Sequence, residues 1–332
     1  MSAIKVTNLN KEFRYYKKGE GLGGSIKNIF SREMLTKDAV KDVSFDISEG
    51  EFIGFIGPNG AGKTTTIKML SGILEPTSGE VNCLGYVPKE RKPAYLEQIG
   101  VVLGQKNQIN SDLPPMETFL LFKEVFGIPE DKFRAKLEEL TKLLDIGDIV
   151  NVQARRLSLG QRMKCELAAA LLHSPKLLFL DEPTIGLDVT SQKNIREFLA
   201  EYNKKHKTTI ILTSHYMQDI ERLCKRIIII DQGGIVFDGS LENLTKQYVK
   251  NKRIQVILAD KEKVDCKTAS VYGKVIECDD GKLIVEVPRE GVAEATSRMI
   301  ADYEVLDLEI SEMDIEEIIT DIFAKHKRKR KT

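Results

Sequence analysis

The segment GPNGAGKT at residues 57–64 constrains the fold more than any other part of the sequence. It matches the pattern G-x-x-x-x-G-K-T, follows the apolar run Phe52–Ile56 and opens a helix, which is the context in which this pattern has meaning. Its glycines allow a tight turn whose backbone N–H groups face phosphate oxygens, and the helix start adds partial positive charge. We therefore predict a nucleotide phosphate-binding loop rather than a chance glycine-rich turn. The expected contacts are Gly57, Pro58, Asn59, Gly60, Ala61, Gly62, Lys63, Thr64 and Thr65.

Two side chains of this loop have separate expected roles. Lys63 should reach the β- and γ-phosphates, and the Thr64 hydroxyl should ligate Mg²⁺. A magnesium nucleotide site also needs a carboxylate, so we expect an acidic residue elsewhere in the sequence that completes the site.

That carboxylate is predicted in KLLFLDEP, where Asp181 and Glu182 directly follow the apolar run 176–180. From the strand end, Asp181 can face the metal through water, and Glu182 can polarise the attacking water. Acids before a proline are also common in ordinary strand-end turns. The phosphate loop makes the catalytic interpretation the stronger one.

The order of apolar runs predicts an α/β protein. Buried-type strands at 52–56, 176–180, 208–212 and 227–230 alternate with helical segments at 116–126, 130–146 and 158–173, which indicates a largely parallel, covered sheet. The chain has 332 residues, which favours two domains. The pattern changes near residue 250, where strands at 253–258, 282–287 and 305–310 and helices at 290–301 and 314–323 indicate a small α+β domain, possibly ferredoxin-like. We predict domains at 1–245 and 250–324, followed by a basic disordered tail at 325–332.

The segment LSLGQ at residues 157–161 lies at the start of an Ala- and Leu-rich helix. Free backbone N–H groups at such a start can bind an anion. Ser158 taken alone is better explained as an ordinary helix N-cap.

Together these motifs resemble the ABC ATPase family over about residues 3–240, with Walker A at 57–64 and Walker B at 176–182. The family signature is LSGGQ, and this chain has Leu159 in place of the first glycine of the pair. The resemblance implies a P-loop NTPase fold with a RecA-like core, an antiparallel β subdomain and a helical subdomain. It also implies that Ser158, Gly160 and Gln161 complete the ATP site of an opposite subunit.

Four further positions match the family one by one. Gln105 in VVLGQ resembles the Q-loop glutamine, which senses Mg²⁺ and water and links to the membrane partner. Asp188 in TIGLD resembles the D-loop aspartate, and His215 in LTSHY the switch histidine that contacts the γ-phosphate. Phe13 matches the aromatic residue that stacks on adenine, although Tyr15 and Tyr16 lie close by.

The resemblance implies an ATP-hydrolysing subunit that uses ATP and Mg²⁺ and couples dimer closure to a separate transmembrane permease. The segments LSLGQRMKCELAAALLHSPKLLFLDEPTIGLD and LTSHYMQDIERLC resemble ATPases of ABC-2 type exporters. Because both halves of a composite site are present in one chain, we expect a homodimer, with a heterodimer possible. The expected location is peripheral, on the cytoplasmic face of the cell membrane.

Two other classes of function compete with this interpretation. One is a non-transport ABC ATPase acting on ribosomes or in DNA repair; the single motif set and the absence of a long heptad run disfavour it. Lys+Arg and Asp+Glu are both 50, so there is no basic excess and no nucleic-acid partner is expected. The other is a regulatory ATP-binding module with little turnover, which Glu182 and His215 argue against.

Three less specific features complete the expectations. The five cysteines are scattered, which favours reduced, mostly buried thiols. The stretch 15–37 is either a surface hairpin or an amphipathic helix with Ile26, Ile29, Phe30 and Met34 on one face. Neither a secretory signal nor an apolar stretch long enough to cross a membrane is visible.

Overall fold

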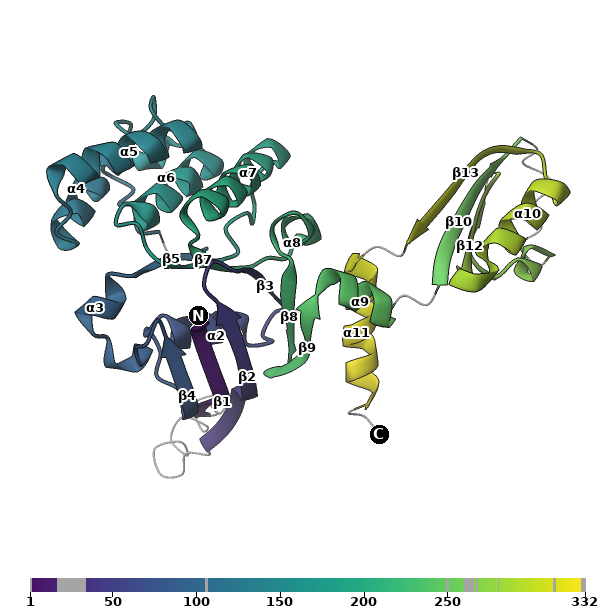
Figure 1. The fold of residues 1–332 in the computed structure, drawn as a ribbon, viewed down its shortest axis with the longest axis horizontal. Coiled ribbons are helices and arrows are strands. Elements are labelled where there is room, and N and C mark those ends of the chain that lie inside the picture. Colours follow the sequence, from purple (N-terminus) through teal and green to yellow (C-terminus); the bar gives the residue numbers. More distant parts are fainter. Residues whose placement is uncertain are drawn as a thin grey trace, which may run out of the picture. The chain divides into compact units, whose positions relative to one another are not determined.

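The computed structural model describes residues 2–16, 34–104, 107–248, 251–259, 266, 268–279, 281–312 and 315–329. The chain forms two compact units, Met1–Gly239 and Ser240–Thr332 (Figure 1). Each unit has its own sheet and its own hydrophobic core.

The centre of the first unit is a six-stranded sheet with the order β5–β6–β7–β3–β8–β9. Every residue of β3, β6 and β7 is buried, which explains why the sequence shows apolar runs rather than alternation there. The five strands from β5 to β8 in this order are parallel, so their carboxyl ends lie at one edge of the sheet. The strands are β3 (Phe52–Ile56), β5 (Ile99–Leu103), β6 (Leu177–Asp181), β7 (Thr209–Thr213), β8 (Arg226–Asp231) and β9 (Gly234–Ser240).

A second sheet of the first unit is antiparallel, with the order β2–β1–β4. Its strands are β1 (Ser2–Tyr16), β2 (Met34–Ser48) and β4 (Ser78–Cys83). Buried residues of all three strands share one core with β3 and with α2 (Lys63–Leu70), the helix that opens the phosphate loop. The glycine-rich loop is therefore held by packing on both sheets.

Helices make up the third part of the first unit. The core helix α6 (Leu159–Leu171) packs against α4 (Pro115–Val125), α5 (Glu130–Leu144) and α7 (Val189–His206). Prolines set two of the predicted starts: α4 begins at Pro115 and α5 directly after Pro129. Among the described residues, the remaining helices of this unit are α3 (Pro93–Leu96), α8 (Met217–Leu223) and the short 3₁₀ turns η1 (Pro88–Glu90) and η2 (Ala154–Arg156). The parallel core, antiparallel sheet and helical part are those predicted for the first domain.

The second unit is the small α+β structure that was predicted. Its sheet has the order β11–β12–β10–β13 and is antiparallel throughout, which is the strand order of a ferredoxin-like sheet. Alternate residues of β10 are buried against α10, so one face of the sheet forms the core. The connection between β10 and β11 contains the 3₁₀ turn η4 among its described residues. The elements are α9 (Leu241–Tyr248), β10 (Asn251–Leu258), η4 (Thr268–Val271), β11 (Lys274–Asp279), β12 (Lys282–Pro288), η5 (Arg289–Gly291), α10 (Val292–Asp302), β13 (Val305–Glu312) and α11 (Ile315–Lys329).

The cysteine prediction was wrong for one pair. Cys266 and Cys278 form a disulfide in the second unit, with their Cα atoms 5.7 Å apart. The fold brings together two thiols that are 12 residues apart, a contact that the scattered spacing did not reveal. Cys83, Cys165 and Cys224 are free and buried, as expected.

Two expectations about irregular segments also need correction. The disordered tail was predicted to begin at residue 325, but α11 continues to Lys329, because lysine and arginine are good helix formers and extend the helix already begun. Residues 330–332 lie outside the described residues. Met34 was placed on a possible helix face, but it lies in β2 and pairs with Tyr16 of β1. Residues 17–33 lie outside the described part of the chain.

Candidate active site

The phosphate loop connects β3 to α2 at the carboxyl edge of the parallel sheet. Gly60 and Gly62 adopt positive φ angles of 79° and 114°, which residues with a side chain rarely adopt. A Cβ atom on Gly57 would lie 2.3 Å from the Ile230 carbonyl oxygen, and one on Gly62 would lie 2.5 Å from that of Ala39. The loop therefore needs these glycines for backbone conformation and for close approach to its neighbours.

Lys63 lies inside this loop and is only 5% exposed. Its Nζ donates hydrogen bonds to the carbonyl oxygens of Gly57 and Pro58, at 2.5 and 3.3 Å. Burial lowers the pKa of Lys63, and the nearby carboxylates of Glu182 and Asp181 oppose that shift. The ammonium group thus lies among backbone oxygens and carboxylates at the position where the sequence predicts phosphate binding.

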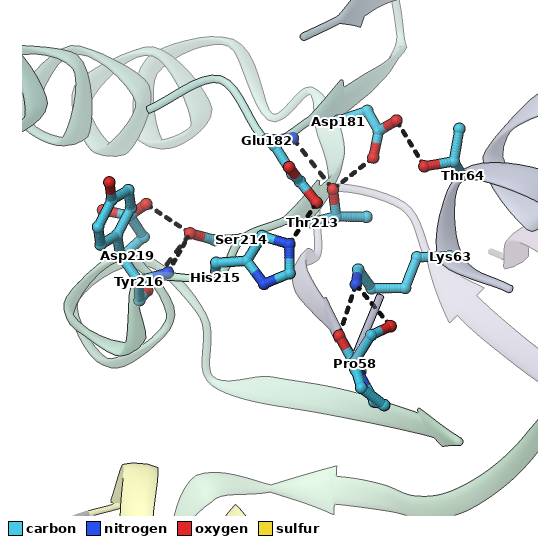
Figure 2. Close-up of polar contacts among 11 residues, drawn as sticks. Pro58, Lys63, Thr64, Asp181, Glu182, Thr213, Ser214, His215, Tyr216 and Asp219 are labelled. Atoms are coloured by element: carbon cyan, nitrogen blue, oxygen red, sulfur yellow. Dashed lines mark hydrogen bonds and ion pairs between the residues drawn. The ribbon is translucent and has the colours of Figure 1, made fainter. Parts of the chain in front are cut away.

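Asp181 ends β6 and lies across from the loop. Its Oδ2 accepts a hydrogen bond from Thr64 Oγ1 at 2.8 Å, and its Oδ1 accepts one from Thr213 Oγ1 at 2.6 Å (Figure 2). The parallel register pairs Asp181 directly with Thr213, which explains how two strand ends reach the same side chain. The predicted metal residues Thr64 and Asp181 are therefore in direct contact.

Their chemistry fits a hydrated Mg²⁺ ion bound to nucleotide. Mg²⁺ prefers oxygen ligands, keeps several waters and takes phosphate oxygens, so one hydroxyl and one carboxylate suffice from the protein. No group of three or more His, Cys, Asp or Glu side chains suited to a metal ion occurs among the described residues. Thr64 and Asp181 are thus the pair that would hold such an ion.

Glu182 contacts His215 directly. Its Oε1 lies 2.7 Å from His215 Nε2, and both side chains are partly exposed, at 21% and 35% (Figure 2). Glu182 has a left-handed backbone with φ of 55°, which a non-glycine residue adopts at a cost of about 1 kcal/mol or more. Its N–H donates to both the hydroxyl and the carbonyl oxygen of Thr213, and these hydrogen bonds hold the unusual conformation.

Lys63, Thr64, Glu182 and His215 line one pocket of about 630 Å³, and Asp181 contacts this lining through Thr64. Phe13 of β1 contributes to its wall, is 39% exposed and lies under the Lys11 ammonium, 5.4 Å from its ring centre. Tyr15 and Tyr16 do not line it. The full lining is Phe13, Lys37, Ala39, Pro58, Asn59, Gly60, Ala61, Gly62, Lys63, Thr64, Thr65, Glu182, Ile185, His215 and Tyr216.

The signature segment has a separate position. Ser158 caps α6: its Oγ accepts from Gln161 N–H at 3.2 Å, and Gln161 Oε1 accepts from Ser158 N–H at 2.9 Å. Gly160 lies so close to α7 that a Cβ there would be 2.4 Å from Ser191 Oγ. Asp188 in turn caps α7 through Ser191. Ser158, Gly160, Gln161 and Asp188 do not line the pocket, and Gln105 lies outside the described residues.

Several residues of the site were not predicted. Thr213 could have been found, because it ends the apolar run before His215 and must meet the end of the neighbouring strand. Lys37 and Ala39 come from β2, far away in sequence, and no local motif marks them. Tyr216 adjoins His215 but carries no pattern of its own.

A glycine-rich phosphate loop, an acid pair at a strand end and a histidine at the next strand end, arranged around one pocket, define a P-loop nucleoside triphosphatase. Comparison with known families agrees. Residues 40–185 match the model of the ABC transporter family, and residues 250–311 match that of the EvrA-like ABC transporter C-terminal domain.

Known relatives extend this result. The chain is 35% identical over 206 residues to the ABC transporter ATP-binding protein NatA of Bacillus subtilis, covering 62% of this chain and 83% of the relative. It is 32% identical to the Nod factor export ATP-binding protein I of Burkholderia orbicola, covering 73% and 81%. A solved ATP-binding subunit of an ABC transporter has a TM-score of 0.60 at 25% identity, covering 74% of this chain and 93% of that one. The chain belongs to the family of ABC transporter ATP-binding proteins, and it is an ATPase of that family.

None of the helices in the described ranges is both long and apolar enough to cross a bilayer.

Proposed function

We propose that two copies of this chain close around two Mg²⁺–ATP molecules and that this closure drives a separate membrane-spanning permease of the exporter type. The observation that carries the proposal is the pocket lined by Lys63, Thr64, Glu182 and His215, with Asp181 bound to Thr64 and Glu182 in contact with His215. These groups supply a cation, a metal site and a base for one phosphoryl transfer.

The reaction is in-line attack of water on the γ-phosphorus. Lys63 leaves its backbone acceptors for the β- and γ-phosphate oxygens, and His215 contacts the γ-phosphate. Glu182 orients and polarises the attacking water. When bound by Thr64 and Asp181, Mg²⁺ neutralises phosphate charge. We assign Gln105 to sensing this metal and the water and to the link with the permease.

The test of this site is Lys63→Ala, which we expect to abolish ATP binding or turnover. Lys132→Ala, an exposed lysine on α5, is the matched control and should behave as wild type. Wild-type hydrolysis by Lys63→Ala would contradict the assignment.

The dimer is supported by signature-segment and D-loop residues that do not line the pocket of their own chain. Ser158, Gly160, Gln161 and Asp188 are assigned to the ATP site of the opposite subunit. We favour a homodimer, because one chain carries both halves of the site, and a heterodimer with a related ATPase is the alternative. Glu182→Gln should dimerise when ATP is added and separate when it is removed, as measured by light scattering. A variant that stays monomeric at saturating ATP would argue against the proposal.

Transport in the outward direction is suggested by relatives named for Nod factor export and for linearmycin resistance. We therefore place the chain peripherally on the cytoplasmic face of the membrane, with the permease as its partner. Affinity purification from mildly solubilised membranes should recover a protein with several membrane spans. Recovery of ribosomes or DNA-repair factors instead would favour the non-transport alternative.

For the domain organisation, we propose an ATPase domain at 1–245 and an accessory domain at 250–324. Limited proteolysis should cut between them and leave two resistant fragments. Cleavage within either range, with the junction intact, would contradict these limits.

A further inference from the structure

One buried carboxylate, that of Asp219 on α8, connects the segments on both sides of the Glu182–His215 contact. Asp219 is fully buried, and its side chain accepts three hydrogen bonds. Thr184 Oγ1 and Ser214 Oγ donate to Oδ2 at 2.5 and 2.7 Å, and Arg196 Nη1 donates to Oδ1 at 2.7 Å. The Arg196 side chain, on α7, is only 4% exposed.

The positions of these donors in the sequence give the network its meaning. Thr184 comes two residues after Glu182, and Ser214 comes directly before His215. The Ser214 hydroxyl also accepts a hydrogen bond from the Tyr216 N–H at 3.0 Å (Figure 2). Hydrogen bonds to the Asp219 carboxylate therefore fix the chain at Thr184, shortly after Glu182, and at Ser214, directly before His215. The Ser214 hydroxyl in turn holds the backbone at Tyr216, directly after His215.

The helix α7 strengthens the same arrangement. Besides Arg196, it supplies Gln192, whose Nε2 donates to the carbonyl oxygens of Thr184 and Leu187 at 3.4 and 3.2 Å. The loop that carries Glu182 is thus held at its side chains and at its backbone. Because a buried carboxylate is costly unless it is paired and hydrogen-bonded, the network is stable only when all of its donors are in place.

We infer that Asp219 is a positioning residue for ATP hydrolysis: through Thr184 and Ser214 it sets the 2.7 Å contact between Glu182 Oε1 and His215 Nε2. The inference rests on the proposed catalytic roles of Glu182 and His215. Asp219 touches neither nucleotide nor reacting atoms, and its effect on turnover comes from holding two groups in the geometry the reaction needs. Displacement of a catalytic group by about 1 Å lowers rates by about 100-fold, so this role is measurable.

Direct replacement of Asp219 or Arg196 would leave a buried charge without its partner and threaten folding. The donors give a milder test. Thr184→Val keeps the shape but removes the donor to Asp219, whereas Thr184→Ser keeps the donor. Ser214→Ala removes the donor on the other side. Thr208→Val is the matched control, because Thr208 is similarly buried and lies just before β7, at the end of that strand away from His215. Its hydroxyl donates to the Pro175 carbonyl oxygen at 3.3 Å and not to Asp219.

We expect kcat for ATP hydrolysis to fall about 10- to 100-fold in Thr184→Val and Ser214→Ala, while the Kd for a non-hydrolysable ATP analogue changes less than twofold. Thr184→Ser and Thr208→Val should keep kcat within about threefold of wild type. If Thr184→Val and Ser214→Ala keep wild-type kcat, or if Thr208→Val and Thr184→Ser lose as much as they do, the positioning role is wrong and the network serves stability alone.

Glu182→Gln, measured in parallel, separates this inference from the proposed function. Loss of turnover in Glu182→Gln with unchanged turnover in Thr184→Val and Ser214→Ala would overturn only the role of Asp219. Wild-type turnover in Glu182→Gln would overturn both.

Discussion

Glu182 combines three properties that rarely occur together: a left-handed backbone, a partly exposed carboxylate and a direct contact with a histidine. A backbone held in a rare conformation next to a phosphate loop fits a residue selected for position. We predict that Glu182→Gln lowers kcat by about 100- to 10,000-fold, because general-base catalysis contributes that much, and leaves the Kd for ATP nearly unchanged. Release of inorganic phosphate and binding of a fluorescent nucleotide check the two parts. The exposed Glu97, changed to Gln, is the control. A parallel loss of binding would show that Glu182 acts on affinity.

Phe13 is the second residue with a sharp expectation, since it is the aromatic side chain of β1 that lines the pocket. Stacking of a base on an aromatic ring contributes about 1–3 kcal/mol, so Phe13→Ala should weaken ATP binding by about tenfold. Tyr15→Ala and Tyr16→Ala should have little effect. Tripolyphosphate, which has no base, should bind equally well to wild type and Phe13→Ala. Calorimetric titration with both ligands tests this, and equal losses for both would contradict stacking.

At the scale of single residues, the sequence predicts residues that belong to local motifs, but it does not predict residues that connect one motif to another. Lys63, Thr64 and Asp181 are found from a loop and a strand end, because each pattern is contiguous. Asp219 has no pattern of its own, since its role depends on three donors from separate elements. Such contacts follow from tertiary packing, which spacing along the chain does not encode.

At the scale of elements, the start of α6 has one observed role and one proposed role. Ser158 and Gln161 form a complete capping box, so the ordinary N-cap interpretation and the proposed contact with a second subunit apply to the same serine. Ser158→Ala should lower the free energy of unfolding by about 1 kcal/mol. Ser158→Asp keeps a good cap and should keep stability, but its charge would repel the phosphates of the opposite site. It should therefore lose ATP-driven dimerisation. Normal dimerisation of Ser158→Asp would argue that this helix tip does not meet nucleotide.

The helices α5 and α7 are joined by a charged cluster around Glu139. Its carboxylate accepts hydrogen bonds from Lys205, Lys136 and His206 at 2.5, 2.9 and 2.9 Å. Burial alone would raise the pKa of Glu139, but these three donors outweigh it and lower the pKa to about 2. In the unfolded chain the value returns to the ordinary range near 4.5.

A pH dependence with a defined sign follows. Since the folded pKa lies below the unfolded one, Glu139 contributes its full stability above the unfolded value and loses it as pH falls towards about 2. We expect the free energy of unfolding of wild type to exceed that of Glu139→Gln by about 1–2 kcal/mol at pH 7, because solvent screens this partly exposed cluster, with the difference shrinking between about pH 5 and 2. Urea unfolding at several pH values measures it, with the exposed Glu138→Gln as control. A difference that grows in acid would contradict the assignment.

Element prediction succeeded where one signal dominated. Prolines set the starts of α4 and α5, and continuous apolar runs predicted β3, β6 and β7 to within a residue. The antiparallel pairing of β1 and β2 up to Tyr16 and Met34 agrees with the surface-hairpin alternative for residues 15–37. Its extent could not be predicted, because the pairing of two strands across a polar stretch depends on register. The connection between β10 and β11 was equally hard to predict, since the turn η4 that its described residues form is too short to give a periodic pattern.

At the scale of the whole molecule, the division into two units separates catalysis from the disulfide. All described residues of the candidate active site lie in the first unit, whereas Cys266 and Cys278 close a loop in the second. By the chain-entropy argument, a loop of this size contributes about 3 kcal/mol. Burial raises the pKa of Cys83 and of Cys165 to about 12, so these buried thiols are unreactive near neutral pH.

Reduction should therefore act on one unit alone. We predict that reducing the protein lowers the unfolding temperature of the second unit, frees two thiols for alkylation and leaves the rate of ATP hydrolysis unchanged. Differential scanning calorimetry, mass spectrometry after alkylation and an ATPase assay give the three readouts. The double variant Cys266→Ser/Cys278→Ser is the control, because it should resemble the reduced protein with or without reductant. If reduction changes ATP hydrolysis in wild type but not in this variant, the second unit is coupled to the catalytic pocket, and the two units do not act independently.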